Sequence, residues 1–192
     1  MGLFLAPAAQ GQQGQPFHEM AVSLLANAPL KMDYHYTLTN SSLRQDTTGT
    51  LVLIGPRTFR LELWDKVYGS DGSSLYLHDR NTRQTVIDSL RWTEVNLWLR
   101  LLQGDLPPGT VTTLIEPSPA GMVHWELSHE EPWWFSVVEV DTNTWLVREI
   151  RLYEEQGWEH LVRLGVPESW NNTNLDSFIT LEDLPGQRLD LR

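Results

Sequence analysis

The chain has 192 residues, no cysteine and a formal net charge of -11. This length suits one domain with a core of its own, and the missing cysteines exclude disulfides and zinc sites built from thiolates. The acidic excess falls in residues 111–192, which hold 5 Lys and Arg residues against 15 Asp and Glu residues. Because nucleic acids and anionic membranes select a clustered basic surface, the composition argues against both as partners.

Residues 1–15 differ in composition from the rest of the chain. Residues 3–5 are a short apolar run, residues 6–8 match a small-residue cleavage site, and a Gln/Gly tract follows. We interpret residues 1–15 as the remnant of a signal peptide and a flexible tract, with the true start upstream. A disordered cytoplasmic N-terminus is the alternative. No run of about 18 apolar residues occurs, so we expect residues 16–192 to form a single domain that does not span a membrane.

Apolar residues then recur first with the period of a helix and next with that of a strand. The helix is expected to begin at Pro16 and to end at Asn27 and Pro29. Its apolar face consists of Phe17, Met20, Ala21, Leu24 and Ala28. From Met32 the period becomes two, which predicts a half-buried strand. The residues that share one face of this strand are Tyr34, Tyr36 and Leu38.

Residues 49–79 hold three alternating apolar runs, at 51–54, 59–63 and 75–77. Breaks rich in Gly, Pro, Asp and Ser separate these runs, which predicts three or four strands of an antiparallel meander. A strand at 85–87 closes the meander. Alternation places Phe59, Leu61 and Leu63 on one face and Arg60 on the other.

Residues 91–103 interrupt the strand pattern with a helical period. The predicted helix is apolar almost all round, so it must be covered on more than one side. Gly104 and Pro107 end it. We interpret it as a lid, with an ordinary core helix as the alternative. The lid residues are Val95, Trp98, Leu99, Leu101 and Leu102.

The second half of the chain returns to strands, predicted at 111–115, 122–127, 133–140, 145–152, 158–164 and 177–181. Loops as short as those between them join neighbouring antiparallel strands. We therefore predict a mainly antiparallel β protein. It is an incomplete, half-open β-barrel of about eleven strands in up-and-down order, with an N-terminal helix and an inserted lid helix. An apolar concave face beneath the lid would enclose a water-poor cavity.

Several stretches taken together match one known family. They are the amphipathic helix, the tyrosine-bearing first strand, a Gly-x-Leu-x-Leu run at 49–53 with Pro56 and Phe59 after it, residues 70–79, the hairpin at 139–150, and Phe178 followed by residues 185–186. In these features the chain resembles the periplasmic lipoprotein carrier proteins of LolA type. The resemblance runs from about Phe17 to the C-terminus and is more specific in the first half.

The resemblance implies an exported, periplasmic carrier without catalysis or cofactor. Such a carrier shelters the acyl chains of lipoproteins, or of a similar lipid, on their way to the outer membrane. The implied partners are an inner-membrane donor complex and an outer-membrane acceptor, and we expect a monomer. In the family an arginine commonly precedes the proline that corresponds to Pro56 and helps to latch the lid; this chain has Gly55 there. Arg57 and Arg60 are close, but Arg60 is expected to point away from the concave face.

Alternation selects the candidate residues of a ligand cavity. Ordinary core packing is the alternative, and an error of one residue in the register would exchange the two faces. The candidates are Tyr34, Tyr36, Leu38, Phe59, Leu61, Leu63, Leu75 and Leu77. Trp133 and Trp134 could dock a partner, although adjacent strand residues face opposite sides and one of the two is expected in the core.

Enzymatic motifs are missing from the sequence, which has no nucleophile elbow, P-loop, dinucleotide fingerprint or metal-ligand spacing among its six His residues. We therefore expect no enzyme, metal or cofactor. One alternative is a Trp-rich β-module that binds or cleaves carbohydrate. Its candidate carboxylates are Glu126, Glu130, Glu131 and Glu139. Another alternative is a lipoprotein-sensing regulatory domain on the same scaffold.

Overall fold

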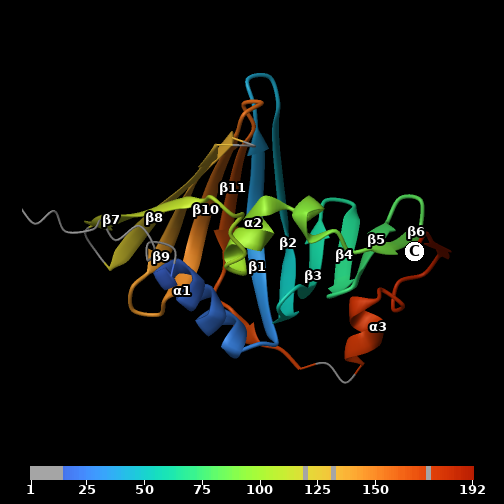
Figure 1. The fold of residues 1–192 in the computed structure, drawn as a ribbon. Coiled ribbons are helices and arrows are strands. Elements are labelled where there is room, and N and C mark those ends of the chain that lie inside the picture. Colours follow the sequence, from blue (N-terminus) through green and yellow to red (C-terminus); the bar gives the residue numbers. More distant parts are fainter. Residues whose placement is uncertain (1–14, 119–120, 131–132, 172–173) are drawn as a thin grey trace, which may run out of the picture.

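The computed structural model describes residues 15–118, 121–130, 133–171 and 174–192. Within these ranges the chain forms one curved sheet of thirteen strands with short helices packed against it (Figure 1). The two edge strands, β7 (Val111–Ser118) and β13 (Gln187–Asp190), do not pair with each other, so the barrel is incomplete as predicted. The expected signal-peptide remnant lies, except for its last residue, outside the described residues.

The first half of the chain forms a meander of six strands. They are β1 (Leu30–Thr39), β2 (Arg44–Gly55), β3 (Thr58–Leu63), β4 (Lys66–Asp71), β5 (Ser74–Asp79) and β6 (Gln84–Ser89). Short turns with side-chain support make each strand pair with the next. In the turn between β4 and β5, Asp71 Oδ1 accepts the backbone N–H groups of Ser73 at 2.8 Å and Ser74 at 2.7 Å.

The second half forms another meander, from β7 to β11. Its further strands are β8 (Met122–Glu130), β9 (Trp133–Asp141), β10 (Leu146–Glu154) and β11 (Glu159–Leu164). Strand β11 pairs antiparallel with β1 and so joins the two meanders into one sheet. The short β12 (Glu168–Ser169) also pairs with β1, and β13 pairs in parallel with β6, so one pair departs from the antiparallel pattern.

The strand order differs from the predicted up-and-down order. The order β13-β6-β5-β4-β3-β2-β1-β11-β10-β9-β8-β7 puts β6 and β7, which are consecutive in the chain, at opposite sides of the sheet. Residues 90–110 must therefore cross the sheet. This connection contains the 3-10 helix η1 (Trp92–Glu94) and the helix α2 (Leu97–Leu102), and Figure 1 shows α2 lying across the sheet.

The predicted N-terminal helix is present as α1 (Gln15–Ala26). Its residues Phe17, Ala21 and Leu24 are buried, and the ring of Phe17 meets the indole of Trp125 edge to face with centroids 6.4 Å apart. Because both rings belong to the main hydrophobic cluster, α1 covers the same side of the sheet as α2.

The predicted strand at 177–181 is wrong, because this segment begins as the helix α3 (Leu175–Ile179). A short apolar stretch has no period long enough to separate a helix from a strand. Helix α3 packs on the outer face of β3 and β4, where Leu181 joins a second, smaller cluster. The other buried members of this cluster are Val67, Tyr76 and Ile87.

The predicted helix at 91–103 is broken in the middle. Val95 has extended backbone, with φ -69° and ψ 145°, and Asn96 starts α2 by accepting the N–H of Trp98 with its side chain. A side-chain oxygen that satisfies a free N–H group is what favours Asn at such a position. The segment that we interpret as a lid, and continue to call the lid, thus consists of a 3-10 turn, an extended residue and a six-residue helix.

Candidate functional site

The eight residues predicted to line a cavity share the concave face of the sheet. In the observed register Phe59 lies opposite Leu53, and Leu61 lies between Leu51 and Tyr68. Paired residues of antiparallel strands point to the same face, so the side chains on β1, β3 and β5 converge. Tyr34, Tyr36, Phe59, Leu61 and Leu63 are buried, and Leu38, Leu75 and Leu77 are half-buried.

Four of these eight residues line a cavity of about 240 Å³ beneath the lid. We call it the lid cavity. From the sheet it is lined by Phe59, Leu61, Leu63, Tyr68 and Leu75, and from the lid by Val95, Asn96 and Leu99. Leu77 lies one pleat further along β5 and does not line it. Apart from Asn96 and the tyrosine hydroxyl, the walls are apolar.

The two predicted tyrosines on β1 pack directly against the lid. The indole of Trp98 lies 5.8 Å from the ring of Tyr34 and 6.4 Å from that of Tyr36, measured between centroids. Trp98, Leu99, Leu101 and Leu102 are all at most 1% exposed. These lid side chains therefore occupy the middle of the concave face.

The hydroxyl groups of the two buried tyrosines on β1 each make a hydrogen bond. The hydroxyl of Tyr34 donates to the backbone carbonyl of Glu62, and that of Tyr36 is hydrogen-bonded to Nδ1 of His160 at 2.7 Å. Burial raises the pKa of both hydroxyls, and the neighbouring carboxylate, Glu62 or Glu154, adds to the rise. Both groups stay neutral and serve to orient the rings.

The lid is fixed at its C-terminal end to the turn between β2 and β3. Oε1 of Gln103 accepts the backbone N–H of Arg57 at 2.9 Å, and the guanidinium of Arg57 lies 5.6 Å from the centroid of the Trp92 ring. Gly55 precedes this turn and has no atom within 4 Å of the place where a Cβ would stand. Two groups of Arg57, its backbone N–H and its guanidinium, thus contact the lid from this turn.

Arg60 lies on the outer face, as its alternation predicted. Its guanidinium donates to the carbonyl of Phe178 at 2.9 Å and to the carboxylate of Asp183 at 2.8 Å, and it stacks 4.1 Å from the centre of the Phe178 ring. It therefore holds the C-terminal segment against β3 and takes no part in the lid contacts.

A larger opening, which we call the rim cleft, lies beside α2 at one end of the strands. It measures about 850 Å³. The lid lines one side of it with residues that include Val95, Asn96 and Arg100, and the tips of two hairpins line the other. The hairpin residues are His129, Trp133, Trp134, Glu154, Glu155, Gln156 and His160.

The two adjacent tryptophans divide as the alternation of strand β9 predicts. Trp134 is 3% exposed and stacks on His129, with planes 6° apart and centroids separated by 6.0 Å. Trp133 is 46% exposed and lines the rim cleft. One of the two indoles is therefore available to a ligand.

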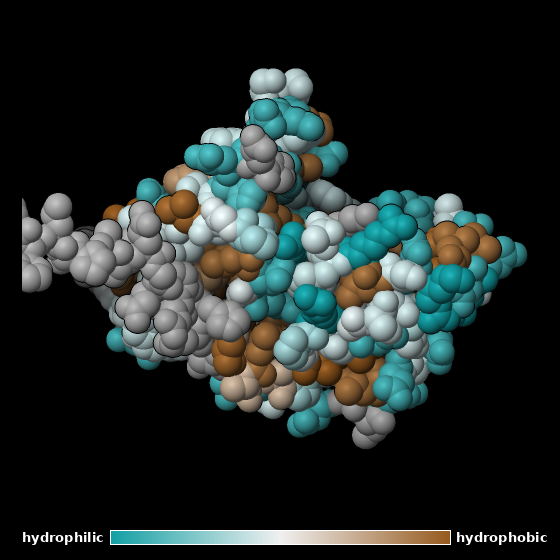
Figure 2. All heavy atoms as spheres, in the orientation of Figure 1, coloured by the Kyte–Doolittle hydropathy of each residue, from teal (hydrophilic) through white to brown (hydrophobic). Residues whose placement is uncertain are grey.

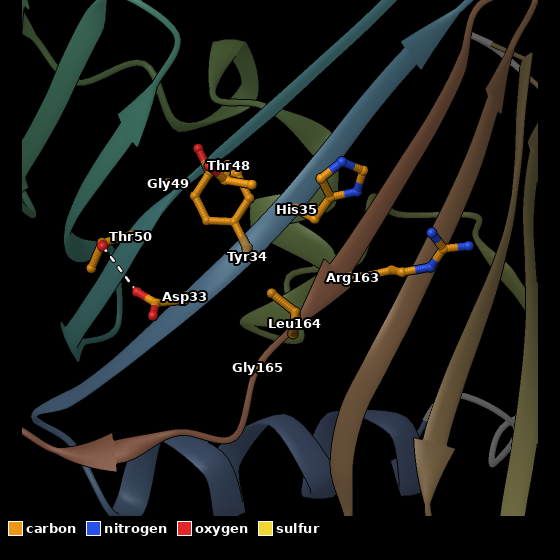
Figure 3. Close-up of a pocket in the computed structure, with 9 residues that line it drawn as sticks. All are labelled: Asp33, Tyr34, His35, Thr48, Gly49, Thr50, Arg163, Leu164 and Gly165. Carbon is orange, nitrogen blue, oxygen red and sulfur yellow. Dashed lines mark hydrogen bonds between the residues drawn. The ribbon is translucent and has the colours of Figure 1, made fainter.

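A third opening, of about 600 Å³, lies on the outer face over β1, β2 and β11 (Figure 3). Its side chains are mainly polar, and Thr50 donates to Asp33 across it at 3.1 Å. This groove does not suit an apolar ligand.

Sequence reasoning missed Tyr68 and Asn96 in the lid cavity, and His160 in the rim cleft. The strand β4 that carries Tyr68 has a Gly-Ser-Asp end and little alternation, so its face was not assigned. Asn96 follows an apolar residue and precedes an apolar run, a helix-start signal that could have located the break in the lid.

Among the described residues, no group of three or more His, Asp or Glu side chains could hold a metal ion. None of their helices combines the length and the hydrophobicity needed to cross a membrane.

The fold is an incomplete antiparallel barrel with the short helix α2 packed on its concave face. No family model matches the sequence, and no curated protein matches it either. Among solved structures the chain resembles a LolA superfamily protein from Nitrosomonas europaea, at 9% identity and a TM-score of 0.49, over 91% of this chain and 100% of that one.

Two other solved structures are similar to the chain. A DUF1329 family protein from Desulfovibrio piger has 8% identity and a TM-score of 0.49, with coverage of 91% of this chain and 100% of that one. A domain from Vibrio parahaemolyticus, named as an outer membrane lipoprotein-sorting protein domain, has 8% identity and a TM-score of 0.44, with coverage of 86% and 97%. At these values the likeness concerns the overall fold alone.

Proposed function

We propose that the protein is a non-enzymatic carrier that shelters the acyl chains of a lipoprotein or similar lipid between its concave face and its lid. The observation that supports this most strongly is the lid cavity, which has apolar walls on both the sheet and the lid. In this proposal the protein is exported to the periplasm and acts as a monomer. It receives its cargo from an inner-membrane donor and delivers it to an outer-membrane acceptor.

The free energy of burial explains why a lidded cavity suits this task. Removing a chain of about 15 methylenes from water contributes on the order of 10 kcal/mol, at roughly 0.8 kcal/mol for each methylene. Only a water-poor cavity provides that much. Figure 2 shows separate apolar patches set among hydrophilic side chains on this face, so the apolar surface that could cover a whole chain lies mostly beneath the lid.

The size of the lid cavity requires the lid to move. Ligand pockets for small molecules usually measure roughly 300 to 1,000 Å³, and the lid cavity measures about 240 Å³. Trp98, Leu101 and Leu102 fill the adjoining space. A long acyl chain therefore fits when α2 swings away and yields its place on the concave face to the ligand.

The arrangement of the second meander does not favour the alternative of a carbohydrate site, because its buried tryptophans and two of the candidate carboxylates lie on opposite faces of the sheet. Trp125 and Trp134 are buried on the concave face, whereas Glu126 lies one residue out of phase and thus on the outer face. Glu139 also lies outside and is hydrogen-bonded to His124 at 2.9 Å. Glu131 is outside the described residues.

Binding of the neutral apolar dye Nile red, with native mass spectrometry of the purified protein, tests the proposal. We expect enhanced dye fluorescence and co-purified apolar ligand. The variant Leu75→Trp fills the lid cavity and should lose most of the dye binding. Leu77→Trp is the matched control, because it makes the same change on the same face of β5 outside the lid cavity. Equal dye binding by the two variants, or no binding by the unmodified protein, would contradict the carrier function.

A further inference from the structure

The concave face changes from apolar to polar toward the rim cleft. Residues paired across β1, β11, β10 and β9 form a row on this face. One such row, which lies beneath the lid, is apolar apart from one tyrosine hydroxyl; its residues are Tyr36, Val162, Ile150 and Val138. Two rows further along, Glu154 lies opposite Trp134, and Trp134 lies opposite His129. His160 stands in the row between. The same surface that is apolar beneath the lid thus ends in ionisable and aromatic groups.

The lid cavity and the rim cleft adjoin each other. Val95 and Asn96 line both openings, with the lid cavity toward β3 to β5 and the rim cleft toward β8 to β11. These two residues form the extended break before α2, so movement of α2 about this break would join the two spaces. A ligand with one apolar and one polar end would fit the joined space, with its apolar end in the lid cavity and its polar end in the rim cleft.

The charges that line the rim cleft favour a ligand whose polar end is positively charged. Glu154 and Glu155 supply two carboxylates, and Glu155 is exposed at the turn between β10 and β11. The one guanidinium in the lining, that of Arg100, is neutralised by Asp105 at 2.8 Å. Burial lowers the pKa of His160, which keeps this side chain neutral near pH 7 although Glu154 opposes the shift.

The exposed indole of Trp133 also favours a positively charged head group. The face of a tryptophan ring attracts an ammonium or guanidinium group, and the attraction grows where water is partly excluded. Trp133 is 46% exposed and belongs to the lining of a cleft that also holds two carboxylates. An anionic head group would instead meet like charges and gain nothing from the indole.

We propose that the rim cleft binds the head group of an amphiphilic ligand and that this head group is cationic, with an ammonium group held between Trp133 and the carboxylates of Glu154 and Glu155. The acyl chain of the same ligand lies in the lid cavity. This inference rests on the proposed carrier function and names the chemical class of its cargo.

Competition between amphiphiles of equal chain length tests the inference. Dodecyltrimethylammonium and dodecyl sulfate, both below their micelle-forming concentrations, are titrated against protein loaded with Nile red. The ammonium compound should displace the dye at a concentration about fivefold lower or more, since a partly exposed charge pair contributes this order of affinity.

The variants separate the rim cleft from the net charge of the whole chain. The double variant Glu154→Gln, Glu155→Gln should abolish the preference for the ammonium compound. The double variant Glu168→Gln, Glu182→Gln removes the same charge at exposed positions outside the rim cleft and should keep the preference. Circular dichroism and the melting temperature confirm that both variants fold.

The outcomes distinguish this inference from the function on which it rests. Equal displacement by both amphiphiles, or an unchanged preference in the rim-cleft variant, overturns the cationic head-group site and leaves the carrier function standing. If Nile red itself does not bind and neither amphiphile binds, the carrier function fails and the inference fails with it.

Discussion

The carboxylate of Asp105 ties Arg100 of the lid helix to the segment that follows it. Oδ2 of Asp105 accepts Nε of Arg100 at 2.8 Å and, at the same distance, the indole N–H of Trp92. Arg100 is 9% exposed, so its guanidinium has little contact with water. One oxygen therefore holds both ends of the lid.

Replacing this carboxylate should loosen the lid. Asp105→Asn leaves a largely buried guanidinium without its counter-charge, which costs roughly 2 kcal/mol. Hydrogen exchange followed by mass spectrometry should show faster exchange in peptides covering residues 92–103, with little change in the sheet. Asp176→Asn, at an exposed position of α3, is the charge-matched control. Unchanged exchange in residues 92–103 would show that Asp105 does not hold the lid.

Two glycines of β2 should respond oppositely to alanine. A Cβ at Gly49 would collide with the carbonyl of Glu62 and stand 2.8 Å from the hydroxyl of Tyr34, whereas a Cβ at Gly55 would meet nothing within 4 Å. Gly49→Ala should therefore destabilise the fold by about 1 to 3 kcal/mol through overpacking. Gly55→Ala should leave stability unchanged or raise it by up to about 1 kcal/mol. Urea denaturation measures both, and equal effects would contradict the close contact at Gly49.

The ion pair on the outer face should matter more than exposed pairs. Asp183→Asn leaves Arg60, which is 5% exposed, without its counter-ion, and we expect a loss of roughly 2 kcal/mol in the free energy of unfolding. The control is Asp190→Asn, whose pair with Arg192 is exposed and screened by water, so that its loss should lower the free energy of unfolding less than Asp183→Asn does. Chemical denaturation that ranks Asp190→Asn above Asp183→Asn would refute this assignment.

Stability should fall as the pH drops from about 7.5 to about 5.5, partly because of His160. Burial lowers the pKa of His160 in the folded protein, so the unfolded chain binds the proton more readily. The free energy of unfolding then decreases as the pH falls through the unfolded pKa of about 6.5. Burial acts on His78 in the same direction.

The variant His160→Gln isolates this effect. It should lose less stability than the unmodified protein across the same pH interval, as measured by urea denaturation, and His78→Gln gives the share of the other histidine. The groups that face His160 are Tyr36 and Glu154. An identical pH slope in His160→Gln and in the unmodified protein would contradict the assignment to His160.

Carboxylates with a lowered pKa do not contribute in this pH interval. The pKa of Asp71, for example, is lowered to about 2 because its hydrogen bonds outweigh the effect of desolvation, so its protonation destabilises the fold only below about pH 4.

Strand faces were predictable from the sequence where the alternation is long. Phe59, Leu61 and Leu63 lie on the concave face and Arg60 lies outside, because the side-chain period of a strand is two whatever its neighbours are. The same rule predicted that one of Trp133 and Trp134 lies in the core, and the structure shows that it is Trp134. The face of Tyr68 was not predictable, since the alternation of β4 is too short.

Local sequence was insufficient where two structures suit the same residues. Residues 177–181 form a short apolar stretch that suits a strand or a helix, and Leu175–Ile179 forms a helix that covers the outer face of β3 and β4. The lid was predicted as one helix although Val95 is extended, because its apolar period continues through the break.

The composition and periodicity of the chain by themselves determined a cysteine-free, mainly antiparallel sheet with an amphipathic first helix and an apolar inserted segment. Only the tertiary structure decided that β6 and β7 lie at opposite sides of that sheet, so that residues 90–110 cross its concave face. It also decided that Val95 and Asn96 separate an apolar cavity from a polar cleft. Periodicity reports which way a side chain points, whereas strand order depends on contacts between residues far apart in the chain.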